Sequence, residues 1–184
     1  MVAMLVLYII VRNNKEKAVL IRSAQTDALT GVYNKENTQN MIDEILRKKD
    51  PDSFHGFLIL DMDHFKEVND VYGHAMGDKV LEMLGNFLKK QFREQDVIGR
   101  IGGDEFVILL YNIGSRQNME NRVKSLQEKI REIHMDGMEG HTFTLSAGIA
   151  FAPQDGDTFM ELYQKADLAL YQVKTFRKER IPDL

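Results

Sequence analysis

Two apolar runs separated by two glycines and two acids constrain the fold of this chain more than any other stretch. Residues 97–101 and 106–110 contain mostly β-branched and other large apolar side chains, and residues 102–105 between them read Gly-Gly-Asp-Glu. Because glycine adopts the positive φ values that a two-residue turn requires, this pattern predicts a tight β-hairpin with two carboxylates at its tip. Crowded carboxylates repel one another unless a cation binds beside them, although a solvated hairpin is the simpler interpretation of the turn alone.

A second acidic cluster follows a short apolar run. Residues 57–60 are the kind of continuous apolar segment that forms a buried central strand, and they lead directly into Asp61, Met62 and Asp63. We expect this strand to lie beside the hairpin, so that Asp61 meets Asp104 at one edge of the sheet. Two carboxylates with the Met62 carbonyl between them form the oxygen-rich site that magnesium prefers. For Asp61 or Asp63 alone, an aspartate that caps a loop is the simpler interpretation.

Helical and strand periodicities alternate along the rest of the chain. Apolar residues recur at helical spacing in segments that begin at Asn34, follow Gly77, span residues 119–133 and follow a capping box at Thr158–Glu161. Strict alternation over residues 143–151 predicts one more strand. Because the hairpin supplies an antiparallel pair, these elements predict an α/β sandwich with a central mixed, largely antiparallel sheet and helices packed around it.

Composition limits both the number of domains and the class of function. The 184 residues are 43% hydrophobic and 28% charged, which suits one globular domain with short flanking pieces. A formal net charge of −4 argues against a general DNA-binding or RNA-binding protein. The absence of cysteine excludes disulfides and thiolate chemistry, as in proteins of a reducing compartment.

The first residues differ in composition from those that follow. Residues 2–11 are almost entirely apolar and are followed by basic residues. Because a bilayer span needs roughly 20 residues, we interpret residues 1–11 as the cytoplasmic end of a membrane helix, residues 12–26 as a helical linker and residues 27–184 as the domain. The domain would then lie in the cytoplasm, attached to the inner face of the cell membrane, with a sensor segment upstream. An amphipathic dimerisation helix is the alternative for residues 1–11.

Short polar motifs occur in a characteristic order between residue 27 and about residue 178. They are Asp27-x-Leu29-Thr30-Gly31, Asp61-x-Asp63-x-Phe65-Lys66-x-x-Asn69-Asp70, Gly73-His74-x-x-Gly77-Asp78, Arg100-x-Gly102-Gly103-Asp104-Glu105-Phe106, Ser146-x-Gly148 and Ala166-Asp167-x-Ala169-Leu170-Tyr171-x-x-Lys174. This order resembles that of the GGDEF family of diguanylate cyclases. The resemblance implies a palm-like ferredoxin-variant fold. It also implies a homodimer that condenses two GTP into cyclic di-GMP and two pyrophosphates.

The resemblance also assigns roles to individual residues. It assigns magnesium, or Mn²⁺ as the alternative ion, to Asp61, the Met62 carbonyl and Asp104. It gives activation of the ribose 3′ hydroxyl to Asp104 or Glu105. The substrate-binding residues that it implies are Phe65, Lys66, Asn69, His74, Asp78, Lys174 and Lys178.

Some of these assignments have a chemical rationale, and others have simpler interpretations. Asn69 and Asp78 match positions that read guanine, because a carboxylate can accept hydrogen bonds from N1 and N2, which adenine does not offer. Lys66 outside the motif would be an ordinary surface lysine, and a turn histidine such as His74 is more often structural. The family usually has arginine where this chain has Lys178, so weaker GTP binding is expected, since lysine cannot form a bidentate fork.

The resemblance further implies a site for product inhibition at Arg93 and Asp96, with Lys129 assisting from a neighbouring helix. A charged helix end with a local ion pair is the simpler interpretation of an isolated Arg-x-x-Asp. Two other functions remain open: a catalytically silent domain that binds GTP or cyclic di-GMP, and an enzyme that makes mixed dinucleotides. The intact signature at residues 102–106 favours an active cyclase.

Overall fold

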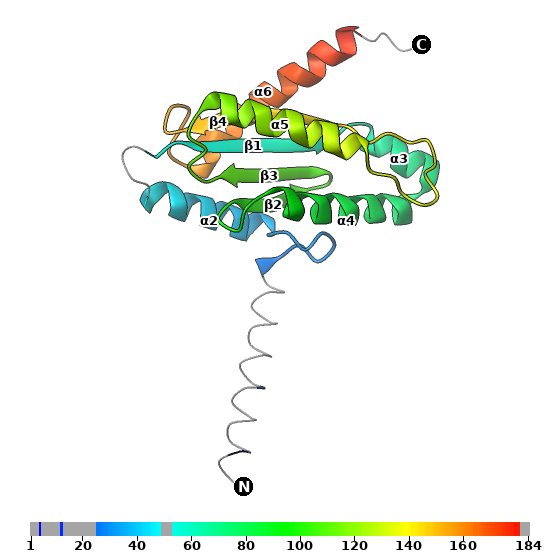
Figure 1. Ribbon diagram of the computed structural model, residues 1–184, viewed down its shortest axis with the longest axis horizontal. Helices are drawn as coiled ribbons and strands as arrows, with labels where there is room; N and C mark the ends of the chain where they lie inside the picture. The colour runs from blue at the N-terminus through cyan, green and yellow to red at the C-terminus, as the bar shows by residue number, and fades with distance from the viewer. Residues whose placement is uncertain (1–3, 5–11, 13–24, 49–52, 181–184) are drawn as a thin grey trace.

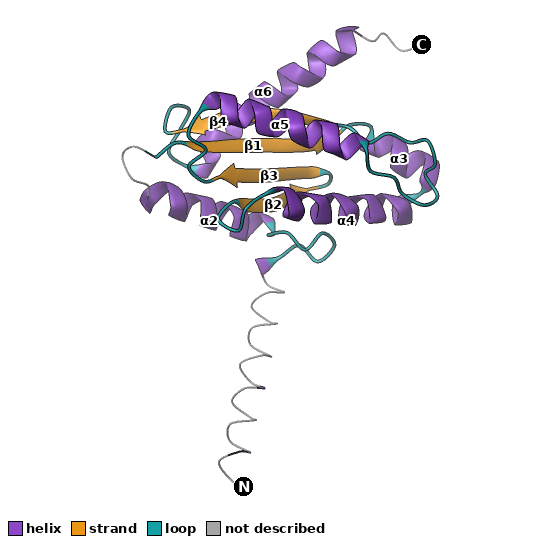
Figure 2. Cartoon of the chain, in the orientation of Figure 1, coloured by secondary structure: helices purple, strands orange, loops and turns teal. Residues whose placement is uncertain are grey.

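A four-stranded antiparallel sheet with helices on both sides forms the molecule (Figures 1 and 2). The structure is a computed structural model that describes residues 4, 12, 25–48 and 53–180, with side chains described as far as residue 176. The strands are β1 (His55–Met62), β2 (Val97–Gly102), β3 (Glu105–Leu110) and β4 (Leu145–Ala152). The helices are α2 (Lys35–Lys48), α3 (Phe65–Tyr72), α4 (His74–Gln91), α5 (Arg116–Arg131) and α6 (Phe159–Arg180).

Strand β1 lies inside the sheet, whose order is β2-β3-β1-β4. It pairs with β3 along one edge and with β4 along the other, so Leu58 lies opposite both Ile108 and Ile149. Residues 57–60 are fully buried, which confirms the prediction of a buried central strand. The predicted α/β class is also confirmed, and a parallel contact is present as an isolated bridge between Tyr33 and Gly99.

Side chains at alternate positions of the strands belong to two separate apolar cores. Leu58 and Leu60 pack in a core with residues of α4 and α5, whereas Phe57 and Ile59 pack in a core with residues of α2 and α6. Figure 1 shows α5 in front of the sheet and α6 behind it. Asp61, which follows Leu60 and is two residues after Ile59, therefore lies on the side of α2 and α6.

The structure differs from the sequence prediction at the helices around the second motif. Phe65–Tyr72 form a separate helix, α3, which was not predicted because a segment of eight residues gives only a short helical pattern. Gly73, with a φ of 83°, lies between α3 and α4, and α4 begins at His74. Gly77 therefore lies inside α4 rather than before it.

The last two helices also differ from the prediction at their ends. Ile133 lies beyond the end of α5 rather than within it. At the start of α6 the capping box is confirmed, because the Thr158 amide donates to Oε2 of Glu161 and the Glu161 amide donates to the Thr158 hydroxyl. The apolar spacing of residues 159–173 predicts that Val173 is buried, but this residue is 39% exposed and lies beyond Leu170, the last of the described side chains of α6 in the core.

The structure contains no helix, among the residues it describes, with the length and apolar character that crossing a bilayer requires. The end of a membrane helix predicted for residues 1–11 falls almost entirely outside the described residues, as does most of the linker predicted for residues 12–26. Both remain predictions from the sequence.

We predict that Gly148→Ala disturbs the packing of α6 on β4. A Cβ atom at Gly148 would lie 2.0 Å from the carbonyl oxygen of Ala166, a backbone atom that moves only if α6 moves. The free energy of unfolding, measured by chemical denaturation, should fall by about 1–3 kcal/mol, as is typical of overpacking. Gly56→Ala on β1 is the matched control, because its Cβ would meet the flexible Met119 side chain at 2.8 Å. Equal destabilisation of the two variants would contradict this account.

Candidate active site

The sheet register brings the acids of the two predicted clusters together. Asp61 of β1 lies directly opposite Glu105 of β3, and Asp104 immediately precedes Glu105 in the hairpin turn. Asp61 follows Ile59, and Glu105 precedes Val107, at the two-residue spacing that keeps side chains on one face of a sheet. Because Ile59 and Val107 belong to the core beneath α2 and α6, both carboxylates lie on that side.

The hairpin turn consists of Gly103 and Asp104, one residue later than the pair of glycines suggests. Gly103 has a φ of 52°, in the left-handed region that favours glycine, whereas Gly102 belongs to β2. A register irregularity between Arg100 and Gly102 precedes the turn. The shift places Asp104 at the tip of the hairpin, where it is half-buried.

Burial and mutual repulsion raise the pKa values of two of these acids. The pKa of Asp104 is raised first by burial and then by the charge of Asp61. The pKa of Glu105 is raised mainly by burial, and the charges of Asp167, Asp61 and Asp104 add to that effect. A cation that binds among partly buried, mutually repelling carboxylates stabilises their charged form.

Helix α6 contributes two side chains to this group of acids. The Nζ atom of Lys174 lies 2.6 Å from Oδ1 of Asp61 and forms an ion pair with it. The Tyr163 hydroxyl donates a hydrogen bond of 2.7 Å to Oε1 of Glu105, which lowers the pKa of this acid against the effect of burial. Lys178 lies further along α6, where side chains are outside the described part of the chain.

The acids suit a divalent metal site that a phosphorylated ligand would complete. Within residues 25–48 and 53–176, no group of three His, Cys, Asp or Glu side chains is arranged to hold a metal ion by itself. Magnesium commonly binds through one or two carboxylates together with substrate phosphates and water. Asp61, Asp104 and the Met62 carbonyl match that kind of site, and the raised pKa of Asp104 indicates an excess of negative charge for a cation to neutralise.

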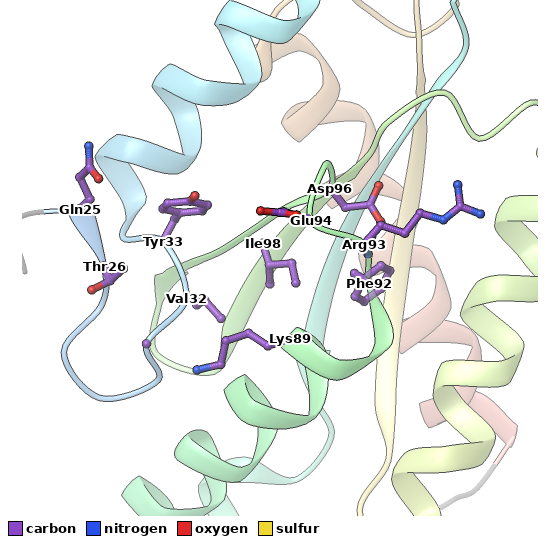
Figure 3. Close-up of a pocket in the computed structure, with 11 residues that line it drawn as sticks. Gln25, Thr26, Val32, Tyr33, Lys89, Phe92, Arg93, Glu94, Asp96 and Ile98 are labelled. Carbon is purple, nitrogen blue, oxygen red and sulfur yellow. Dashed lines mark hydrogen bonds between the residues drawn. The ribbon is translucent and has the colours of Figure 1, made fainter. Parts of the chain in front are cut away.

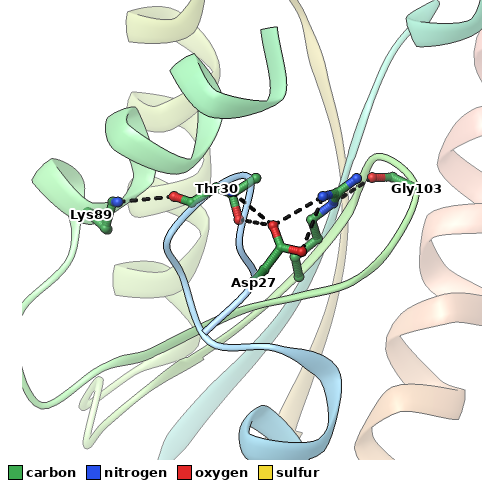
Figure 4. A network of polar contacts seen from close by, with 5 residues as sticks. Asp27, Thr30, Lys89 and Gly103 are labelled. Carbon is green, nitrogen blue, oxygen red and sulfur yellow. Dashed lines mark hydrogen bonds and ion pairs between the residues drawn. The ribbon is translucent and has the colours of Figure 1, made fainter. Parts of the chain in front are cut away.

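Arg100 links the start of the domain to the hairpin turn (Figure 4). Its Nε donates to the carbonyl of Gly103 at 2.8 Å, and its Nη1 contacts the two carboxylate oxygens of Asp27 at 3.1 and 3.3 Å. The Asp27 carboxylate also accepts hydrogen bonds from the amide and hydroxyl of Thr30. Lys89 of α4 donates to the carbonyl of Thr30. The turn is therefore tied to the residues that lead into α2.

Asp63, the other acid after the buried strand, stabilises a loop. Its carboxylate accepts hydrogen bonds from the hydroxyls of Thr144 at 2.7 Å and Ser146 at 2.5 Å, and its amide donates to the Thr144 carbonyl. The interpretation as a loop-capping aspartate is therefore correct for Asp63. It does not describe Asp61, whose carboxylate forms the ion pair with Lys174.

Most of the other predicted substrate-binding residues lie on α3 and in the first turns of α4. They are Phe65, Lys66, Asn69, His74 and Asp78. The first turn of α3 presents backbone amides of the kind that bind anions. Asn69 packs against the first turns of α4, because a Cβ at Gly77 would lie 2.0 Å from its Oδ1 atom. Asp78 follows Gly77 and is exposed. The side-chain amide of Asn69 and the carboxylate of Asp78 therefore belong to the same region, where α3 meets α4.

Arg93 and Asp96 lie in the turn before β2 and line two cavities. Asp96 is buried, and its carboxylate oxygens accept hydrogen bonds from the backbone amides of Arg93 and Tyr111 at 2.9 and 3.0 Å. One cavity, of about 470 Å³, lies between this turn and residues 25–33, which Figure 3 shows on its opposite side. The other cavity, of about 420 Å³, is also lined by Arg122 of α5.

Comparisons with known proteins identify the family. The sequence profile described as "Diguanylate cyclase, GGDEF domain" matches residues 24–180. Diguanylate cyclase TpbB of Pseudomonas aeruginosa is 36% identical over 168 residues, which cover 89% of this chain and 38% of TpbB. The chain belongs to the GGDEF family of diguanylate cyclase domains.

Solved structures of other GGDEF domains share the fold. The isolated GGDEF domain of TpbB from Pseudomonas aeruginosa superposes with a TM-score of 0.77 at 31% identity, covering 82% of this chain and 89% of that one. A structure of DgcB from Caulobacter crescentus in complex with c-di-GMP has a TM-score of 0.80 at 21% identity, which supports the fold alone; it covers 91% of this chain and 89% of that one. This chain spans 38% of TpbB and 35% of the probable diguanylate cyclase DgcT of Escherichia coli.

The sequence revealed the acids of this GGDEF domain and Lys174, but not Tyr163 or the ion pair of Arg100 with Asp27. Tyr163 lies eleven residues before Lys174, about three helical turns, so the two side chains share one face of α6. That spacing indicates that Tyr163 belongs to the site only once Lys174 is known to lie there. Asp27 and Arg100 both belong to motifs, but no local pattern indicates that residues so far apart in the sequence form an ion pair.

We predict that Asp104→Asn stabilises the folded GGDEF domain at neutral pH. Because the folded state raises the pKa of Asp104, it binds this proton more readily than the unfolded state, so stability falls as the pH rises above the ordinary value of 3.8. Asparagine removes that penalty. The thermal midpoint of the variant should therefore exceed that of the parent at about pH 7, and the difference should shrink toward about pH 3.

Asp136→Asn is the matched control for this experiment, because Asp136 is exposed. Its thermal midpoint should follow that of the parent across the same pH range. A midpoint for Asp104→Asn below that of the parent at neutral pH would show that burial and repulsion do not disfavour this carboxylate.

Proposed function

We propose that this GGDEF domain is a diguanylate cyclase that condenses two GTP molecules into cyclic di-GMP and two pyrophosphates. The observation that supports this most is the placement of Asp61 opposite Glu105, with Asp104 beside them in the turn. Carboxylates at the edge of a sheet suit nucleotidyl transfer, which needs positioned oxygen ligands rather than a covalent intermediate. All positions of the signature at residues 102–106 are present.

The proposed chemistry is an in-line displacement at the α-phosphorus of each GTP. The 3′ oxygen of one GTP forms a bond to the α-phosphorus of the other, the bond to the bridging oxygen breaks, and pyrophosphate leaves with the electron pair. The hydroxyl proton passes to a base, for which Asp104 and Glu105 are the candidates. Magnesium, or Mn²⁺, held by Asp61, Asp104 and the Met62 carbonyl would neutralise phosphate charge and make the 3′ hydroxyl more acidic. Lys174 would bind phosphate.

We place the guanine at the junction of α3 and α4. There the Asp78 carboxylate can accept hydrogen bonds from N1 and N2, and the Asn69 amide can satisfy a neighbouring polar atom of the base. His74 is the first residue of α4. The amides at the start of α3, near Phe65 and Lys66, are suited to the phosphates.

The symmetry of the product requires two copies of the domain. One domain provides one set of acids, whereas the cyclic product forms by two equivalent attacks in opposite directions. Two protomers related by a two-fold axis would present their GTP sites to each other and hold the reacting groups close. We therefore propose a homodimer as the active form.

A silent binding domain is the alternative function. The cyclic di-GMP phosphodiesterase PdeR of Escherichia coli is 32% identical over 151 residues, which cover 82% of this chain and 22% of PdeR. Likeness to a protein of this group of relatives therefore does not by itself establish synthesis. The intact acids and the ion pair of Lys174 with Asp61 favour the cyclase.

The test measures nucleotide products and pyrophosphate from GTP alone, from ATP alone and from both together. GTP alone should give cyclic di-GMP, and turnover per protomer should rise with protein concentration because two domains must meet. Asp61→Ala should reduce turnover to background while Asp136→Ala matches the parent. No turnover by the folded parent at any concentration would favour the silent domain, and a mixed product would favour the other base specificity.

We predict that Asp78→Ser weakens discrimination between GTP and ATP. Serine is too short to replace a carboxylate that accepts from both N1 and N2 of guanine. The ratio of kcat/KM for GTP to that for ATP should fall at least about 100-fold, since a site built to hydrogen-bond its substrate rejects an unmatched one strongly. Asp136→Ser is the exposed control. Unchanged selectivity in Asp78→Ser would show that Asp78 does not read the base.

We also infer that cyclic di-GMP inhibits the enzyme by binding at Arg93 and Asp96. The exposed Arg93 side chain can donate two hydrogen bonds to guanine O6 and N7. Asp96 already accepts two backbone amides, but each carboxylate oxygen can accept a second bond. Arg122 lines the same cavity of about 420 Å³ and is better placed to assist than Lys129, whose Nζ donates to Gln91 at 2.9 Å.

We predict that Arg93→Ala relieves product inhibition without lowering the initial rate. Inhibition of the parent should be non-competitive with GTP, because the turn before β2 is separate from the acids in the hairpin. The inhibition constant, obtained from pyrophosphate release at increasing cyclic di-GMP, should rise at least about 10-fold on loss of a bidentate pair. The exposed Arg131→Ala serves as control. Equal inhibition of the parent and Arg93→Ala would leave Arg93 as part of a solvated turn.

A further inference from the structure

One contact of the site has no role in the proposed reaction: the hydrogen bond of 2.7 Å that the Tyr163 hydroxyl donates to Oε1 of Glu105. We propose that Tyr163 is a positioning residue, which holds the Glu105 carboxylate in its working orientation beside Asp61 and Asp104. This inference rests on the proposed cyclase function, because it requires Glu105 to act in the chemical step.

The aromatic ring of Tyr163 is held firmly enough to position another group. It stacks on Phe159 with ring centroids 5.7 Å apart and planes inclined by 24°. Phe159 in turn meets Phe57 of β1 edge-on, with centroids 5.6 Å apart, and both phenylalanines are buried. A hydroxyl on a ring anchored in this way loses little further conformational freedom when it forms a hydrogen bond.

The Glu105 carboxylate needs such a restraint because its neighbours repel it. Its flexible side chain is half-buried, and the charges of Asp61, Asp104 and Asp167 act on it. Rotation away from these acids would relieve the repulsion, and the hydrogen bond from Tyr163 opposes that rotation. With Oε1 held by the hydroxyl, the orientation of the whole carboxylate is restrained, and Oε2 can accept a proton.

A neutral donor suits this position better than a cation does. Lys174 neutralises part of the charge of Asp61, whereas the Tyr163 hydroxyl holds Glu105 without cancelling its charge. The carboxylate therefore keeps the capacity to act as a base. Burial, and then Glu105 itself, raise the pKa of Tyr163, so the hydroxyl retains the proton that it donates.

The first experiment compares Tyr163→Phe with the parent in steady-state kinetics of pyrophosphate release from GTP. The substitution keeps the stacked ring and removes only the hydroxyl. The value of kcat should fall at least about 10-fold, in line with loss of a hydrogen bond to a charged group. The KM for GTP should stay within about 2-fold of the parent, because Glu105 acts in the chemical step rather than in binding. Tyr171→Phe, on the same helix at a side chain that is 68% exposed, should match the parent.

The second experiment measures the interaction in the folded protein without substrate. Chemical denaturation of the parent, Tyr163→Phe, Glu105→Ala and the double variant forms a thermodynamic cycle, which removes the separate effects of each substitution. A coupling free energy clearly different from zero would support the hydrogen bond. A coupling of zero would overturn the inference whatever the activity.

The two experiments together distinguish a failure of this inference from a failure of the proposed function. An inactive folded parent would contradict the cyclase proposal and with it any positioning role, while the cycle would still report whether the bond exists. An active parent with unchanged kcat in Tyr163→Phe would overturn the positioning role alone. A fall in kcat accompanied by a comparable rise in KM and by destabilisation of the fold would identify Tyr163 as merely structural. This result would also overturn the positioning role.

Discussion

Asp61, Asp104 and Glu105 repel one another, and the fold has to hold them together against that repulsion. Strand pairing forces Asp61 and Glu105 to face each other, and the turn adds Asp104. Partial burial strengthens the repulsion by removing water, and this raises the pKa values of Asp104 and Glu105. The fold holds the acids in place because the apolar strands beneath them are paired along both edges of β1 and covered by helices on both faces.

Helix α6 supplies two side chains that contact these acids. One face of the helix brings Lys174 to Asp61 and Tyr163 to Glu105. These contacts need the helix to lie very close to β4, where the glycine at 148 leaves room for the carbonyl of Ala166. Gly148 lies opposite Ile59, two residues before Asp61 on β1, so packing close to the acids determines whether Lys174 and Tyr163 reach them.

The sequence predicted what local patterns determine and missed what only tertiary contacts determine. The hairpin, the buried strand before Asp61 and the capping box at Thr158 follow from short-range spacing, and all are present. Helix α3 was missed although Phe65, Val68 and Tyr72 follow helical spacing, because a segment of eight residues is too short for that pattern to stand out. The link from Arg100 to Asp27 and the bond from Tyr163 to Glu105 join segments distant in the chain. Which residues meet in these two contacts depends on the order of the strands and on how the helices pack on the sheet, and the spacing of apolar residues specifies neither.

Lys174 makes metal and nucleotide binding interdependent under the proposed function. Its ammonium group lies 2.6 Å from Oδ1 of Asp61, on a carboxylate that a divalent ion would need. A metal ion that binds Oδ1 of Asp61 would displace this ammonium group, and the displacement is favourable when the group gains another anionic partner. The phosphates of GTP are such a partner, so each ligand removes an obstacle to the other. By thermodynamic linkage, the metal and the nucleotide must then raise each other's affinity by the same factor.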